Sequence, residues 1–173
     1  MADRESTLIL LTNSYPLERG EEFLENEISH LCRSFDQVVI APVQAGGDAE
    51  VTRGVPDNAR IWRVGARAPQ GAARGRALVK GLRHLPVQGV DWSAARREPR
   101  LVVSDALFEA RAQNALDGLL AHIPSLHLSP DSHVTIYSFW LHITARTATL
   151  LADHLRSQGI TVDRVEIGRA SCR

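Results

Sequence analysis

Lysine, cysteine and aromatic residues are scarce in this chain. Lys80 is the only lysine, there are two cysteines in 173 residues, and aromatic residues make up 5%. Cys32 and Cys172 stand far apart, with no CxxC pair and no Cys/His cluster. This excludes a disulfide framework and a zinc site, and it favours a reducing, cytoplasmic location. Apolar runs are also short: Leu8 to Leu11 cannot form a signal peptide or a membrane span.

The common nucleotide and metal motifs are missing as well. The chain has neither the GxGxxG fingerprint of dinucleotide-binding loops nor the GxxxxGK[ST] phosphate loop. Its seven histidines show no HExxH or comparable spacing, so we expect no metal site and no cofactor. We also find no Ser/His/Asp or Cys/His arrangement and assign no catalytic residue. Among the histidines, only His142 is notable, because it follows the end of an expected strand.

Charge is balanced overall but unevenly placed. The formal net charge is +0, which gives no reason to expect a nucleic-acid partner. Glutamates crowd the first expected helix, and arginines dominate the middle of the chain. Two interpretations stay open for the arginines: solvated helix faces, or a surface for anionic ligands and lipid head groups. The middle group comprises Arg60, Arg63, Arg67, Arg74, Arg76, Lys80, Arg83, Arg96, Arg97 and Arg100.

Strands and helices alternate along the expected order. The apolar runs at 7–13 and 38–40 predict buried strands, separated by a helix with Leu24, Ile28 and Leu31 on one face. After an exposed loop at 44–58, "ARIWRV" predicts a third strand held by Ile61 and Val64. A short basic helix at 75–85, a long helix at 101–123, a strand at 133–140, a helix at 141–158 and a strand from 160 follow. We expect Ser104 to cap the long helix and Pro124 to end it.

This alternation predicts an α/β, Rossmann-like fold with a mostly parallel sheet and helices on both faces. Ligands on such sheets bind beyond the carboxyl ends of the strands, which points to the loops 14–22 and 137–142. The candidate binding residues are Tyr15, Gly20, Glu21, Ser138, Trp140 and His142. Each also has a structural interpretation: Glu21 would complement the helix dipole, and the aromatic residues would belong to the core.

Two segments together resemble a known family. They are "LLTNSYPLERGEEFLENEISHLCRSFDQVVIAPV" and "VTIYSFWLHITARTATLL", and the first covers about a fifth of the chain. They are similar to the N-terminal domain of bacterial family 4 glycosyltransferases, retaining enzymes of the GT-B fold. The shared features are a strand ending at Tyr-Pro, Gly-Glu before Phe, a Glu-Ile pair, an FDxVxxxP strand and a Tyr-Ser-aromatic-Trp strand end.

The resemblance implies two Rossmann-like domains that face each other across a cleft. The N-terminal one takes mainly the acceptor, a glycan or lipid-linked glycan, and the missing C-terminal domain holds the nucleotide-sugar. In the family, the last strand continues into a Ser-Arg-Ala-His-Gly segment with an active-site histidine, and here it does not. Residues 1–165 would thus be an incomplete N-terminal domain, inactive alone, of an enzyme of surface-polysaccharide biosynthesis. Its arginine-rich region would contact the inner face of the cell membrane peripherally.

The last residues bear on the length of the native chain. "EIGRASCR", residues 166–173, can be back-translated into a common sequencing-library adaptor. We therefore expect the native sequence to diverge at or near Val165, with 166–173 a foreign tail. The alternative hypothesis is a complete, non-catalytic Rossmann-like domain that binds a small phosphorylated ligand at Gly20.

Overall fold

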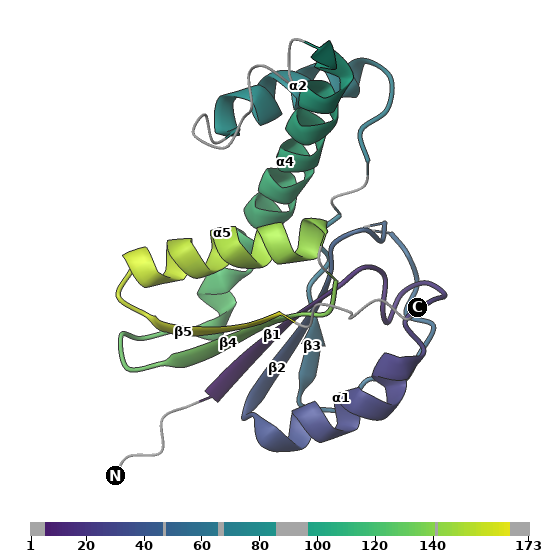
Figure 1. The fold of residues 1–173 in the computed structure, drawn as a ribbon. Coiled ribbons are helices and arrows are strands. Elements are labelled where there is room, and N and C mark those ends of the chain that lie inside the picture. The colour runs from purple at the N-terminus through teal and green to yellow at the C-terminus, as the bar shows by residue number, and fades with distance from the viewer. Residues whose placement is uncertain (1–5, 47, 66–67, 86–96, 141, 167–173) are drawn as a thin grey trace.

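The computed structural model describes residues 6–46, 48–65, 68–85, 97–140 and 142–166 and shows a parallel sheet flanked by helices (Figure 1). The strand order is β3-β2-β1-β4-β5, with every neighbouring pair parallel. This confirms the predicted α/β, Rossmann-like fold. The elements are β1 (Ser6–Thr12), α1 (Phe23–Ser34), β2 (Gln37–Pro42), β3 (Ala59–Ile61), α2 (Ala72–His84), α4 (Pro99–Leu120), η2 (Ile123–Leu126), β4 (His133–Ser138), α5 (Ile143–Ser157) and β5 (Thr161–Glu166).

The central strands are apolar on both faces because helices cover both faces. Ile9 and Leu11 of β1 point to the side of α4 and α5, where they share a core with Leu119 and Leu151. Leu8 and Leu10 point to the opposite side, where α1 contributes Leu24, Ile28 and Cys32. Figure 1 shows α5 on one face and α1 on the other. Burial raises the pKa of the Cys32 thiol, as expected for a core cysteine rather than a nucleophile.

Several local predictions need correction. β3 ends at Ile61, and the buried residue beside it is Trp62, 4% exposed, while Ile61 and Val64 are only half-buried. α4 begins at Pro99, whose ring presets the backbone for a first helical turn, so Ser104 lies inside the helix and caps nothing. The helix ends at Leu120, and Pro124 belongs to η2. The loop 44–58 is not exposed throughout, because Ala45 is buried.

Other parts of the sequence predictions fall outside the described residues. These are most of the irregular segment 86–99, Leu141, and the expected tail from residue 167 onward. Within the described part, no helix is both long enough and apolar enough to cross a bilayer.

Helix α2 and the first half of α4 project beyond the sheet as a helical arm (Figure 1). The two helices meet at Gly81, which is buried against α4. A Cβ at this position would lie 1.7 Å from the carbonyl oxygen of Ala106. Glycine is therefore required here to let the two backbones approach, and the contact fixes where α2 crosses α4.

We expect Gly81→Ala to lower the free energy of unfolding by about 1–3 kcal/mol, because the new methyl group forces the helices apart. Gly75→Ala is the matched control: it lies in the same helix, and its Cβ would meet nothing within 4 Å. At position 75 the higher helix propensity of alanine should raise the free energy of unfolding by up to about 1 kcal/mol. Urea unfolding followed by circular dichroism measures both, and an equal response of the two variants would contradict the close approach.

Candidate functional site at the carboxyl edge of the sheet

The strand order places a topological switch point between β1 and β4. The chain leaves β1 toward α1 on one face and leaves β4 toward α5 on the other. The loops after these strands, 13–22 and 139–142, therefore diverge at the same edge of the sheet. In open α/β sheets a ligand binds in the crevice that such a divergence leaves.

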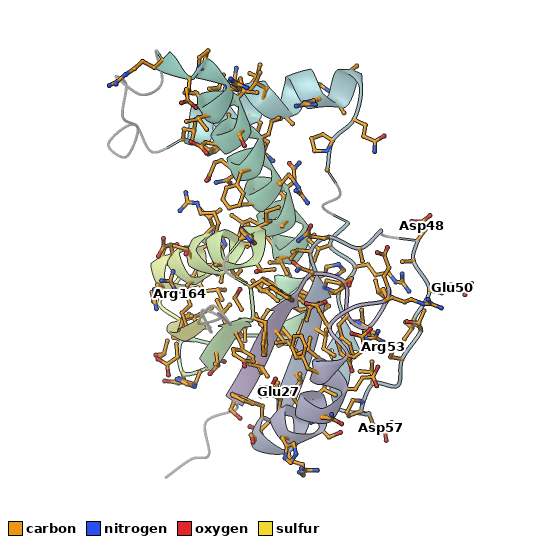
Figure 2. All side chains as sticks on the ribbon, turned by 45° about the vertical axis from the view of Figure 1, so that its right-hand side comes forward. Glu27, Asp48, Glu50, Arg53, Asp57 and Arg164 are labelled. Carbon is orange, nitrogen blue, oxygen red and sulfur yellow. The ribbon has the colours of Figure 1, made fainter. Side chains whose placement is uncertain are left out.

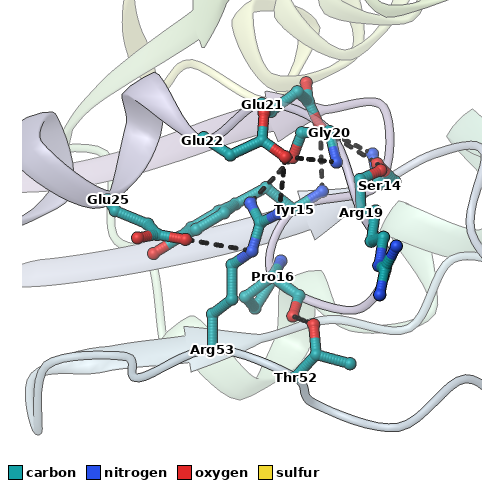
Figure 3. Close-up of polar contacts among 10 residues, drawn as sticks. All are labelled: Ser14, Tyr15, Pro16, Arg19, Gly20, Glu21, Glu22, Glu25, Thr52 and Arg53. Atoms are coloured by element: carbon teal, nitrogen blue, oxygen red, sulfur yellow. Dashed lines mark hydrogen bonds and ion pairs between the residues drawn. The ribbon is translucent and has the colours of Figure 1, made fainter.

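A single carboxylate ties the two loops together. Glu21, 7% exposed, turns back under the β1 loop and accepts hydrogen bonds from the backbone N–H groups of Asn13 (2.9 Å), Ser14 (2.8 Å) and Tyr15 (2.8 Å). The indole N–H of Trp140, beyond β4, donates to the same carboxylate at 2.6 Å. Two strong donors thus reach each oxygen, which nearly fills the lone-pair sites of the group. Figure 3 shows the β1 side of this arrangement.

The backbone at 20–21 has an unusual shape that makes this possible. Gly20 has φ 105°, and Glu21 follows with φ 60°. Positive φ is ordinary for glycine but uncommon for a glutamate, and it costs conformational energy unless contacts hold it. Here the hydrogen bonds to the Glu21 carboxylate hold it. As a result the side chain turns away from α1 and into the sheet edge, which argues against the interpretation that it complements the helix dipole.

Arg53 clamps the outside of the same loop. Its guanidinium donates to the Gly20 carbonyl oxygen at 2.7 Å and pairs with Glu22 (3.2 Å) and Glu25 (3.0 Å), and it lies 5.8 Å from the centre of the Tyr15 ring. The side chain is only 12% exposed. Figure 2 shows Arg53 directed inward, whereas Asp48, Glu50 and Asp57 of the same loop are exposed. The contacts of Arg53 in Figure 3 tie this part of the loop to the β1 loop.

The end of β4 supplies aromatic side chains. Tyr137 is buried and donates its hydroxyl to Glu27 at 3.1 Å; burial and the Glu27 carboxylate raise the pKa of this phenol, so it stays a neutral donor. Phe139 packs against Phe23 with ring centres 4.5 Å apart and the rings tilted by 41°, and Trp140 contacts Phe23 edge-on at 6.4 Å. Phe23 is 42% exposed. Phe23, Phe139 and Trp140 form what we call the aromatic rim, at the carboxyl edge of the sheet.

Polar residues from α4 and α5 complete the neighbourhood. Arg146 pairs through two nitrogens with buried Glu109 (2.9 and 3.0 Å). Although burial alone would raise the pKa of Glu109, its bonds to Arg146 and Gln113 outweigh burial and lower it. On the other side, Arg111 donates to Gln44 (3.1 Å), which donates to Asn13 (2.6 Å).

The structure separates the predicted site residues into two groups. Tyr15 and Ser138 are buried, and Ser138 donates internally to the Trp140 carbonyl oxygen, so both support the loops. Glu21 is the internal anchor of both loops. Gly20 and Trp140 are half-buried and His142 is exposed at the start of α5, so these three remain accessible at the edge of the sheet.

Sequence reasoning missed Arg53, Gln44 and Phe23. The first two act over long chain separations and carry no local pattern. Phe23 had a signal: it is an aromatic residue on the polar side of an amphipathic helix.

This arrangement constrains the chemistry of the crevice. A phosphate-binding loop offers free N–H groups to its ligand, but the N–H groups of 13–15 are already bonded to Glu21. The described residues hold no group of His, Cys, Asp and Glu that could bind a metal. What remains accessible is an aromatic surface with a histidine beside it.

No protein-family model, curated protein or solved structure matches this chain significantly. The function must therefore be argued from the geometry of the site itself and from the motifs it contains.

We expect Glu21→Gln to lower the free energy of unfolding by about 2–4 kcal/mol, because an amide offers one acceptor oxygen and leaves buried donors unpaired. Glu22→Gln is the control: its carboxylate is exposed, so the substitution should leave the free energy of unfolding nearly unchanged. Urea titration monitored by tryptophan fluorescence compares them. Equal losses would show that Glu21 does not anchor the loops.

Proposed function

We propose that this chain forms the acceptor-side domain of a glycosyltransferase that moves a sugar from a nucleotide-sugar to a glycan or lipid-linked glycan in surface-polysaccharide synthesis. The observation that carries the proposal is the Glu21–Trp140 bond. It joins the Gly-Glu motif of the first resembling segment to the Tyr-Ser-aromatic-Trp motif of the second at one crevice. Through this bond the two motifs hold the β1 and β4 loops together, which neither motif could do alone.

The contacts of Glu21 also favour an acceptor over a phosphorylated ligand at this crevice. A phosphate near residues 13–15 would have to displace the carboxylate from its three backbone donors and would be repelled by it. An uncharged sugar meets neither obstacle. This argues against the alternative of a stand-alone domain that binds a phosphorylated ligand at Gly20.

The aromatic rim suits a sugar ring, which has an apolar face of C–H groups and a periphery of hydroxyls. Phe23 and Trp140 would pack against the apolar face, and His142 would hydrogen-bond a hydroxyl. The nucleotide-sugar, whose diphosphate must be neutralised during transfer, would bind to a second domain across the cleft. In this proposal the residues of the present chain position the acceptor and exclude water from it.

Titration of the ¹⁵N-labelled chain with methyl glycosides, and separately with UDP and GDP, tests the proposal. We expect a glycoside to shift the signals of the Trp140 indole, His142 and Gly20 at millimolar concentration, and nucleotides to leave them unchanged. Phe23→Ala should remove the response because it deletes the exposed ring of the rim. Phe108→Ala, an exposed phenylalanine on α4, is the matched control.

The outcomes discriminate between the two hypotheses. Nucleotide-induced shifts at Gly20, without any response to glycosides, would overturn the acceptor site and support the phosphorylated-ligand domain. Sequencing the gene across the codon for Val165 is an independent check, since the proposal requires the reading frame to continue into a second α/β domain.

We also propose that the outward face of α2 contacts anionic membrane surfaces. Val79 and Leu82 are 51% and 48% exposed on this face, and the exposed arginines Arg76 and Arg83 flank them. Lys80, by contrast, points to α4 and pairs with Asp117 at 2.6 Å. Exposed apolar side chains bordered by cations are the pattern of a helix that lies in a lipid interface.

Sedimentation with vesicles containing phosphatidylglycerol tests this contact. We expect Arg76→Glu combined with Arg83→Glu to reduce binding severalfold, because each basic residue near such a surface contributes about 1 kcal/mol. The control is Arg33→Glu with Arg60→Glu, which changes the net charge equally at exposed positions on α1 and β3. If both double variants lost vesicle binding equally, net charge alone would explain the effect, and the outward face of α2 would not be a docking face.

A further inference from the structure

The inner side of the helical arm carries a separate cationic pocket. Side chains of α2 and α4 enclose a hollow of about 380 Å³, lined by Arg74, Arg100, Val103, Ser104, Leu107, Phe108 and Arg111. Three guanidinium groups thus border one space, and none of the described acidic residues lines it. A hollow with this lining lowers the energy of an anion inside it.

The charges of this pocket lack carboxylate partners. Among the described residues, Arg74 and Arg100 make no ion pair, in contrast to Arg53 and Arg146, which pair with glutamates. Arg111 bonds to Gln44 through one nitrogen, but its Nε is buried and has no partner. Burial lowers the pKa of Arg111, yet an arginine stays charged at neutral pH. No described carboxylate pairs with these three guanidinium groups, so an oxyanion in the hollow would balance their charge.

The helix geometry brings these groups into register. Arg100, Ser104, Leu107 and Arg111 follow one another at spacings of four, three and four residues, which places them on one stripe of α4. The stripe runs about 16 Å along the helix axis, from the tip of the arm to the sheet edge. Arg74 enters the pocket from α2, whose crossing with α4 is fixed at Gly81. The pocket is therefore built by the packing of two helices.

Apolar side chains lie between the cations. Val103 and Phe108 are 37% and 36% exposed. Exposed apolar surface within a cationic hollow suits a ligand that has both a negatively charged group and an apolar part. We propose that this pocket binds a phosphate monoester that carries an apolar group: the phosphate contacts Arg74, Arg100 and Arg111, and the apolar part packs on Val103, Leu107 and Phe108. This site does not depend on the proposed glycosyltransferase function.

Binding of the full chain to three soluble probes, measured by calorimetry and ¹⁵N spectra, tests the proposal. The probes are inorganic phosphate, dihexanoyl phosphatidic acid and dihexanoyl phosphatidylcholine, each below its micelle concentration. We expect phosphatidic acid to bind most tightly, inorganic phosphate about tenfold more weakly, and phosphatidylcholine not measurably. The Gln44 side-chain amide should shift with the first two probes, because it contacts Arg111.

The variants separate this pocket from the general charge of the chain. Arg74→Met with Arg100→Met should weaken binding of both phosphate probes about tenfold or more. Arg33→Met with Arg60→Met removes the same charge from exposed positions on α1 and β3 and should leave both affinities unchanged. Phe108→Ala should weaken the binding of phosphatidic acid only. Phe23→Ala, at the aromatic rim, should leave the binding of both phosphate probes unchanged.

Three results would overturn the proposal. Absence of phosphate binding, or equal losses from the two arginine pairs, would show that no such pocket exists. Inorganic phosphate binding as tightly as phosphatidic acid would exclude the amphiphilic ligand. Since glycoside binding depends on Phe23 and not on Phe108, failure here is distinguishable from failure of the acceptor site.

Discussion

The carboxylate of Glu21 is the constraint on which the sheet edge depends. A buried carboxylate is costly unless strong donors surround it, and here three backbone N–H groups and an indole do so. The same bonds hold Glu21 at φ 60°, direct the β1 loop into α1 and place the β4 loop beside it. Where a nucleotide-binding Rossmann fold keeps its first loop open for a phosphate, this chain has closed it with its own anion.

Much of the fold was predictable because its strongest signals are local. β1 and β2 are continuous apolar runs since both faces of the sheet are covered, and α1 and α5 have clear apolar stripes. β3 was less predictable because it is a short edge strand whose buried residue, Trp62, follows its end. The start of α4 was misjudged because Ser104 has the chemistry of a cap, while Pro99 starts the helix earlier by its fixed φ.

The site was only partly predictable, for a different reason. The rule that ligands bind beyond the carboxyl ends of strands selected two loops that do meet at one edge of the sheet, but it could not assign roles within them. The partner of Glu21 is Trp140, 119 residues away, and Arg53 reaches Gly20 across 33 residues. Such contacts leave no periodicity in the sequence. A local interpretation of Glu21, as a charge near a helix start, therefore missed the backbone reversal that turns it inward.

Hydrogen bonds also set the aromatic rim and the cationic pocket at a fixed relative position. From Trp140 they run through Glu21, Asn13 and Gln44 to Arg111 on α4. Contiguity of this kind is no proof of energetic coupling. It does mean that α4 cannot slide along the sheet without breaking the Gln44 contact, while the Arg146–Glu109 pair ties the same helix to α5. The arm is thus held at its base from two sides, so whatever binds its outer half is positioned relative to the crevice.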